Sequence, residues 1–206
     1  MKKLIIAMSI IVFGNCFSQM VTPIYNTDKD QEGVYYKDTF NDYDKFAGTW
    51  KYTNGTTSLT IVLQKKLRQT IYDNNLNYEM DFIIGGYRYI ENGIEKINTI
   101  AQLSQNLPHV IDYYIDGYTI AGSNSIYCFD CETNDRVLFL GFTGPNKDIF
   151  LMESEMLFKR VDSGGVEKLE LNFRMVSAPP IDVDVPETGN SNYSVPFGKY
   201  ILTKIN

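Results

Sequence analysis

The chain has 206 residues, of which 44% are hydrophobic and 21% charged, a balance that excludes global disorder and fits one domain with an extension. Its formal net charge of −6 disfavours binding to nucleic acid, because neutralising phosphates requires clustered Lys and Arg. The many aromatic residues, including 15 Tyr and 12 Phe, favour β-strands.

The N-terminus has the pattern of a secretory signal. Lys2 and Lys3 precede the apolar run 4–13, which is too short to cross a bilayer. We predict a signal peptide over residues 1–18 with cleavage before Gln19, and therefore export to the periplasm or the extracellular space. Lipidation of Cys16 is the alternative, although the residues before it are a poor lipoprotein box. No later apolar run reaches about 18 residues, so no transmembrane segment is expected after signal removal.

Residues 19–45 form a polar leader with little periodicity, which is predicted to lie across the domain, with one helical turn before Phe46 left open. A hairpin is then predicted, with strands at 46–53 and 58–66 around the turn signal Asn54-Gly55. Residues 77–84 alternate between apolar and polar side chains, as a half-buried strand does.

Gly85 and Gly86 predict a bulge or sharp bend after that strand. Asn92-Gly93 is a second hairpin signal. The segment 136–143 is apolar on both faces and is predicted to be a central strand, and 166–175 alternates cleanly. The regular strand spacing without a clear helix is typical of a sandwich or a barrel.

Near the C-terminus, the Pro- and acid-rich stretch 177–196 is predicted to be a long surface loop. Residues 197–206 are predicted to form a closing strand.

The run Phe-Ala-Gly-Thr-Trp-Lys-Tyr at 46–52 resembles the first strand of the lipocalin-like (calycin) barrels. The resemblance implies an antiparallel meander over 46–206 that closes as a lipocalin-like barrel, with Gly48 and Trp50 in structural roles. We take this all-β fold as the prediction, with a β-sandwich as runner-up. Lipocalins pack a late arginine on the tryptophan, and Arg174 is the candidate by position, although alternation places it on a polar face. The whole chain also resembles small secreted Bacteroidetes proteins of unknown function.

Few residues in the chain suggest catalysis. Cys128 and Cys131 have β-like flanks, which favours a structural disulfide or two loop thiols over a redox centre. A zinc site would need a second ligand pair, and none is present in the sequence. His109 is the single histidine, and no nucleophile-elbow motif accompanies it. We therefore assign no catalytic residue, metal ligand or cofactor.

Three functions remain open. The first is a binding protein for a small apolar ligand held in the barrel. The second is a structural or interaction protein with a filled barrel and no ligand, because small barrels leave little internal room. The third is a hydrolase with acidic catalytic residues that no spacing identifies.

Overall fold

The computed structural model describes residues 18–25, 29, 31–73, 75–123, 125, 127–128, 131–145, 153–177 and 193–205. Strands and three short 3-10 helices make up its regular structure, and no α-helix occurs in these ranges. The strands are β1 (Val21–Pro23), β2 (Tyr35–Lys37), β3 (Gly48–Asn54), β4 (Thr57–Asp73), β5 (Leu76–Glu91), β6 (Ile94–Asn98), β7 (Ile115–Ala121), β8 (Val137–Phe142), β9 (Glu153–Arg160), β10 (Lys168–Ser177) and β11 (Gly198–Ile205). The 3-10 helices are η1 (Asp42–Lys45), η2 (Ile100–Ser104) and η3 (Val110–Asp112). The predicted signal peptide lies outside these ranges up to residue 17.

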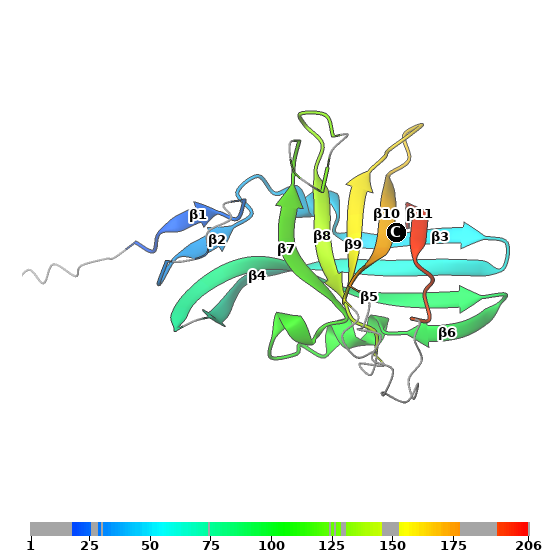
Figure 1. Ribbon diagram of the computed structural model, residues 1–206, viewed down its shortest axis with the longest axis horizontal. Helices are drawn as coiled ribbons and strands as arrows, with labels where there is room; N and C mark the ends of the chain where they lie inside the picture. Colours follow the sequence, from blue (N-terminus) through cyan, green and yellow to red (C-terminus); the bar gives the residue numbers. More distant parts are fainter. Residues whose placement is uncertain are drawn as a thin grey trace, which may run out of the picture.

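Eight antiparallel strands close into a barrel in the order β3, β4, β5, β7, β8, β9, β10 and β11, and β11 returns to β3. Figure 1 shows β7 to β10 standing across the long β4–β5 hairpin. The predicted meander barrel is therefore confirmed, and the chain does not adopt the alternative sandwich.

One edge of β5 is shared by three strands in succession. Parallel β2 pairs at Glu79 and Met80, antiparallel β7 pairs at residues 83–85, and β6 pairs at residues 88–91. Strand β1 adds a further parallel pairing to β2. The leader 19–45 thus contributes two strands, which its lack of periodicity did not predict, because its short apolar pieces dock beside β5. It also contains η1, at the position of the helical turn considered before Phe46.

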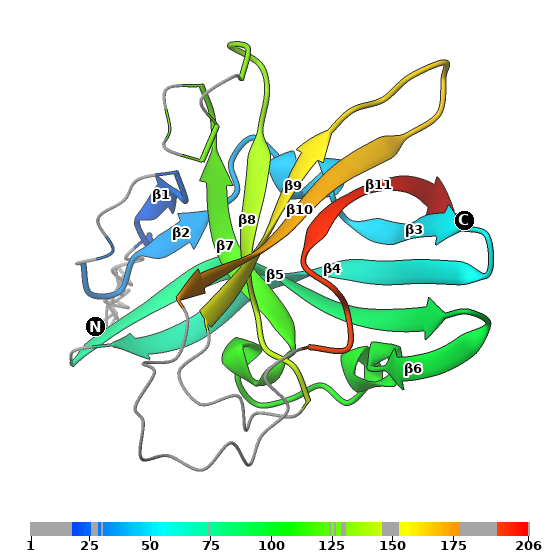
Figure 2. The same ribbon diagram turned by 45° about the vertical axis from the view of Figure 1, so that its right-hand side comes forward.

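The two closing seams of the barrel are short. Strand β11 pairs with β3 only over Thr203, Lys204 and Ile205, and β7 pairs with β5 over three residues as well. Figure 2 shows β11 curving over so that its own C-terminal end reaches β3. Beyond this contact the β3–β4 hairpin extends past the barrel.

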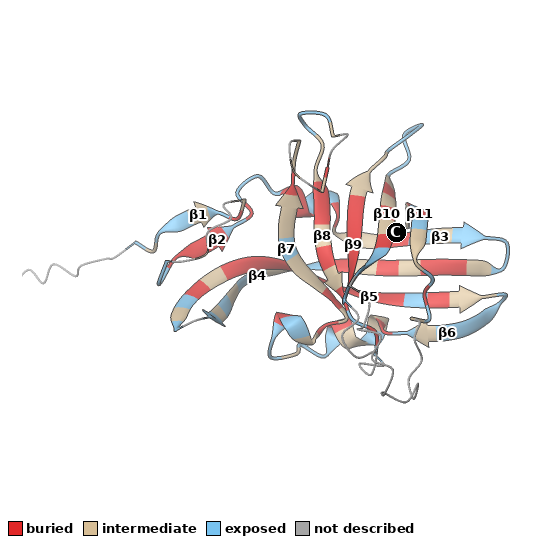
Figure 3. Ribbon diagram, in the orientation of Figure 1, coloured by how far each residue is buried: buried red, intermediate tan, exposed pale blue. Residues whose placement is uncertain are grey.

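Large apolar side chains fill the interior of the barrel. Buried positions alternate along residues 59–63 of β4 and along β10, as a period of two requires, whereas β5 and β9 are buried continuously over much of their length (Figure 3). The inward residues that are 0% exposed are Trp50, Leu59, Ile61, Ile83, Ile115, Leu138, Leu140, Met156, Phe158, Leu169, Leu171 and Leu202. Because a void large enough for water would expose its lining, these side chains are in full contact with their neighbours.

The glycine pair of β5 is part of an unbroken strand rather than a bend. The β4–β5 register runs continuously through Gly85 and Gly86. A Cβ at Gly85 would lie 2.9 Å from Leu63 inside the barrel, and a Cβ at Gly86 would lie 3.0 Å from the Cα of Ile100 outside it. The two glycines therefore allow close packing on both faces of β5, which explains why the predicted bulge is wrong.

Candidate functional site

One end of the barrel is closed around Trp50 and is called here the closed end. The indole is 0% exposed and donates its Nε1–H to the carbonyl of Phe46 at 2.7 Å. Two cations flank its ring, with the Arg160 guanidinium and the Lys204 ammonium each 5.4 Å from the ring centroid. Such contacts favour the electron-rich face of an indole.

Gly48 makes room for one of these cations. Its φ of 133° lies in a region that L side chains rarely adopt. A Cβ at this position would stand 3.1 Å from Cε of Lys204. The Gly-x-Trp sequence thus has a local physical reason, because the glycine leaves space for the lysine that lies on the tryptophan.

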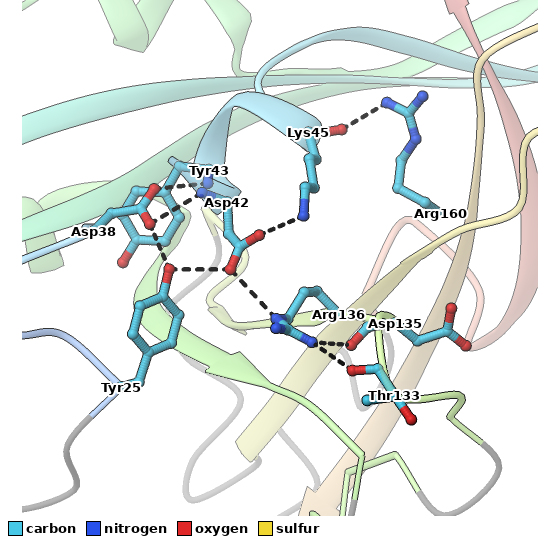
Figure 4. Close-up of polar contacts among 9 residues, drawn as sticks. All are labelled: Tyr25, Asp38, Asp42, Tyr43, Lys45, Thr133, Asp135, Arg136 and Arg160. Atoms are coloured by element: carbon cyan, nitrogen blue, oxygen red, sulfur yellow. Dashed lines mark hydrogen bonds and ion pairs between the residues drawn. The ribbon is translucent and has the colours of Figure 1, made fainter. Parts of the chain in front are cut away.

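Arg160, rather than Arg174, is the arginine on Trp50. Its Nη1–H donates to the carbonyl of Lys45 in η1 at 2.7 Å, as Figure 4 shows. The ends of β9 and η1 are joined by this contact. Arg174 instead forms an ion pair with Glu155 on the outer face of the neighbouring strand.

A network of buried carboxylates fixes η1 beneath the closed end (Figure 4). Asp38 accepts the backbone N–H groups of Asp42 at 3.0 Å and Tyr43 at 2.8 Å, which satisfies the free donors at the start of the helix. The Tyr25 hydroxyl lies 2.6 Å from the Asp38 carboxylate and 3.0 Å from that of Asp42. Burial, followed by these hydrogen bonds, raises the pKa of Tyr25, so the phenol stays protonated.

The same network ties the β7–β8 loop to the closed end. Asp42 is buried and contacts the Lys45 ammonium at 2.5 Å and Nε of Arg136 at 3.3 Å. Arg136 also donates to the carbonyls of Thr133 and Asp135 within its own loop. These contacts satisfy a buried charge, which otherwise carries a large desolvation cost. The network therefore holds η1 and the β7–β8 loop together.

Asp81 is a buried carboxylate that the sequence pattern placed on a polar face. It is 1% exposed and accepts hydrogen bonds from the Tyr35 hydroxyl at 2.6 Å and the Asp38 N–H at 3.0 Å. The backbone N–H of Arg68 also donates to it at 2.9 Å, within a bulge of β4 where Arg68 has a φ of 56°. The leader covers this part of β5, so Asp81 is buried and its carboxylate holds the leader against the strand.

The opposite end of the barrel carries a cluster of aromatic side chains, called here the aromatic mouth. Its members are Tyr52, Tyr87, Tyr89, Phe142, Phe173, Tyr193, Phe197 and Tyr200. Ring centroids of Phe142 lie 4.7 Å from Phe173 and 4.9 Å from Tyr193. Tyr52 meets Tyr200 edge-to-face at 5.1 Å. Such geometries are favourable for aromatic pairs.

The segment 193–197 covers the aromatic mouth. Val195 is buried, whereas Tyr193 and Phe197 are only partly buried. The Tyr200 hydroxyl donates to the carbonyl of Pro196 at 2.5 Å, and burial raises the pKa of Tyr200 to about 12. The stretch 177–196 was predicted to be a surface loop. Of its described residues, Ser194 and Pro196 are exposed and Val195 packs on the barrel, and residues 178–192 lie outside the described ranges.

Cys128 and Cys131 form a disulfide in the loop between β7 and β8, with their Cα atoms 5.2 Å apart. Cys128 is buried in a small outer cluster with Ala121, Val137 and Leu157. The loop therefore packs on the outer face of the barrel. Its position there suits a structural bridge.

The remaining residues considered as functional do not converge. His109 is exposed and directly precedes η3. Within the described ranges, no three His, Cys, Asp or Glu side chains are grouped as metal ligands. Among those same residues, no helix is long and apolar enough to cross a membrane.

Comparison with known proteins gives a family for the chain but no function. No curated protein and no solved structure matches it. A model of a family of unknown function, DUF6705, matches residues 1–205. The match covers nearly the whole sequence, from the predicted signal to the last strand. The chain therefore belongs to the DUF6705 family of unknown function.

Proposed function

We propose that this protein is an exported, lipocalin-like binding protein that takes a small apolar ligand at the aromatic mouth. The observation that carries the proposal is the asymmetry of the barrel. One end is sealed by Trp50 and its two cations, while the other gathers eight aromatic side chains, two of which, Tyr193 and Phe197, belong to the short covering segment.

The packing of the core indicates where such a ligand would bind. Side chains deeper in the barrel, such as Leu140 and Leu171, are 0% exposed, so they leave no space for a ligand. Tyr52, Tyr193 and Phe197 are partly exposed at the mouth and offer apolar surface with hydroxyl groups at its rim. The ligand would therefore lie under or beside the segment 193–197.

The proposal is binding rather than catalysis. The buried carboxylates of Asp38, Asp42 and Asp81 already accept hydrogen bonds or ion pairs that hold the closed end together. Carboxylates that make these contacts stabilise the fold.

A fluorescent titration tests the binding site. The probe is N-phenyl-1-naphthylamine, a neutral apolar dye, added to purified mature protein. Phe197→Ala removes one ring of the mouth and should weaken dye binding several-fold. Tyr72→Ala removes a tyrosine that is 79% exposed on β4, and should leave binding unchanged. Equal affinity in all three proteins would contradict a site at the mouth.

A filled barrel that acts as a structural or interaction protein is the second candidate. The observation in its favour is the complete burial of the inward side chains. Native mass spectrometry with lipid extraction, performed on protein purified from its own host, separates the two candidates. A co-purified apolar molecule supports the binding protein, whereas its absence together with no dye binding supports the filled barrel.

Export has its own test. N-terminal sequencing of secreted protein should give Gln19 or Met20 as the first residue, because the signal is predicted to end at Ser18. A mature chain that starts at a lipid-modified Cys16 would show anchoring instead.

A further inference from the structure

A second aromatic site lies outside the barrel, at the fork where β2 and β7 separate along the edge of β5. The β2 pairing ends at Met80, and the β7 pairing begins at Ile83. Between them the Tyr43 hydroxyl lies 2.8 Å from the carbonyl of Tyr118 and 3.3 Å from that of Asp81. A side chain thus bridges the gap that the two strands leave.

Two edge-to-face aromatic pairs stand on either side of this fork. Tyr36 of β2 meets Tyr78 of β5 with ring centroids 5.5 Å apart and planes at 88°. Phe82 of β5 meets Tyr118 of β7 at 5.5 Å and 82°. Tyr78 and Phe82 lie on the same face of β5, because they are four residues apart in one strand. The two aromatic pairs therefore lie on one face of β5, with the fork as the place between them.

A cation of the chain itself occupies this place. The Lys29 ammonium lies 4.8 Å from the ring centroid of Tyr36 and 6.0 Å from that of Tyr118. It also donates to the carbonyl of Ile24 at 2.9 Å. Aromatic faces around a cation are the arrangement by which proteins recognise quaternary ammonium groups.

Two further observations indicate a ligand rather than only an internal contact. Tyr36 is 1% exposed, and its buried hydroxyl has no hydrogen-bond partner, which is uncommon and costly. Tyr118 is 36% exposed, so the site reaches the surface. Burial raises the pKa of Tyr78, and the nearby Asp73 carboxylate raises it further, so a negative charge lies close by.

We propose that Tyr36, Tyr78, Phe82 and Tyr118 form a binding site for a small organic cation that carries a hydrogen-bonding group, and that Lys29 is its internal competitor. Choline represents this class, because its trimethylammonium group suits the aromatic faces and its hydroxyl suits Tyr36. An incoming cation displaces the Lys29 ammonium into solvent. The negative net charge of the chain favours the approach of cations.

The test is titration of the full mature protein with choline, followed by amide chemical shifts in NMR spectra. Lys29→Ala removes the competitor and should tighten choline binding by roughly 2- to 30-fold, the range that one cation–π contact spans. The neutral isostere 3,3-dimethylbutanol should bind neither protein. Adding Tyr118→Leu to Lys29→Ala should abolish binding, whereas adding Tyr72→Leu should not.

Two more comparisons define the ligand. Tyr36→Phe should weaken choline binding more than tetramethylammonium binding, because only choline has a hydroxyl group. Binding to phosphatidylcholine vesicles is measured beside binding of free choline. The comparison shows whether the site recognises the trimethylammonium group on a lipid or in a free molecule.

The proposal fails if Lys29→Ala binds choline no better than wild type, if dimethylbutanol binds equally well, or if Tyr118→Leu has no effect. Circular dichroism establishes that each variant is folded. If Lys29→Ala does not fold, wild type and Tyr118→Leu are titrated to high choline concentration instead. Wild type should then bind choline and Tyr118→Leu should not, and equal binding by the two would refute the proposal.

Discussion

Replacing Trp50 with alanine should destabilise the barrel more than any surface change. The indole is 0% exposed, and truncation of such a side chain costs about 3–5 kcal/mol. The change also removes the hydrogen bond to the Phe46 carbonyl, which adds about 1 kcal/mol. The expected loss of about 4–6 kcal/mol is a large share of the ~5–15 kcal/mol that keeps a domain folded.

Urea unfolding measures this loss. With a denaturant slope of about 2 kcal/mol per molar urea, the midpoint should fall by roughly 2–3 M. Far-ultraviolet circular dichroism is the signal, because the variant lacks the single tryptophan of the chain. Tyr72→Ala is the matched control, since this ring is 79% exposed and its loss should change stability by less than about 0.5 kcal/mol. If Trp50→Ala also stays within that range, Trp50 does not close the barrel and the reasoning is refuted.

Three further predictions concern the closed end, a partly buried acid and the disulfide. Arg160→Ala should lower the thermal midpoint more than Lys204→Ala, because Arg160 also holds the Lys45 carbonyl; equal losses would contradict this role. Burial raises the pKa of Asp116 from 3.8 to about 7, so the folded state binds the extra proton and wild type should lose stability as pH rises from about 4 to 7. Asp116→Asn should flatten that dependence in urea midpoints measured at pH 5 and 8, and an unchanged slope would show that Asp116 does not cause it. Thiol labelling of denatured, unreduced protein should find Cys128 and Cys131 blocked, and replacing both with serine should cost about 2 kcal/mol in urea unfolding, because the closed loop is short.

Patterns that depend on neighbouring residues predicted much of the fold. The hairpin predicted at 46–53 and 58–66 is present as β3 and β4, and the alternating residues Leu59, Ile61 and Leu63 of β4 are all buried. Asn92 and Gly93, with φ values of 52° and 80°, form the predicted two-residue turn between β5 and β6. The predicted closing strand is β11, and it pairs with β3, the first strand of the barrel.

Features that depend on register and distant contacts were not predictable. Arg160 reaches Trp50 because β9 ends beside the closed end, and the sequence of β9 alone carries no signal of this. Asp81 alternates as a surface residue would, yet the leader buries it. Val195 lies in a Pro-rich, polar context that hides its packing on the aromatic mouth.

The four rings at the fork also lacked a sequence signal, because they come from three strands far apart in the chain. Tyr36 and Tyr118 are separated by more than eighty positions. Only the choice of β2 and β7 as successive neighbours of β5 brings them together. A search for tyrosines in strands would have found Tyr36, Tyr78 and Tyr118 separately, but neither Phe82 nor the group.

The two short seams of the barrel have a consequence for its dynamics. Three residue pairs join β5 to β7, and three join β3 to β11, whereas the β4–β5 and β9–β10 ladders are far longer. Local opening is easiest where few backbone hydrogen bonds must break together. The barrel should therefore open as two leaves, β3–β5 and β7–β11, and amide protons of Gly117 and Thr203 should exchange with deuterium well before those of Ile61 and Leu171.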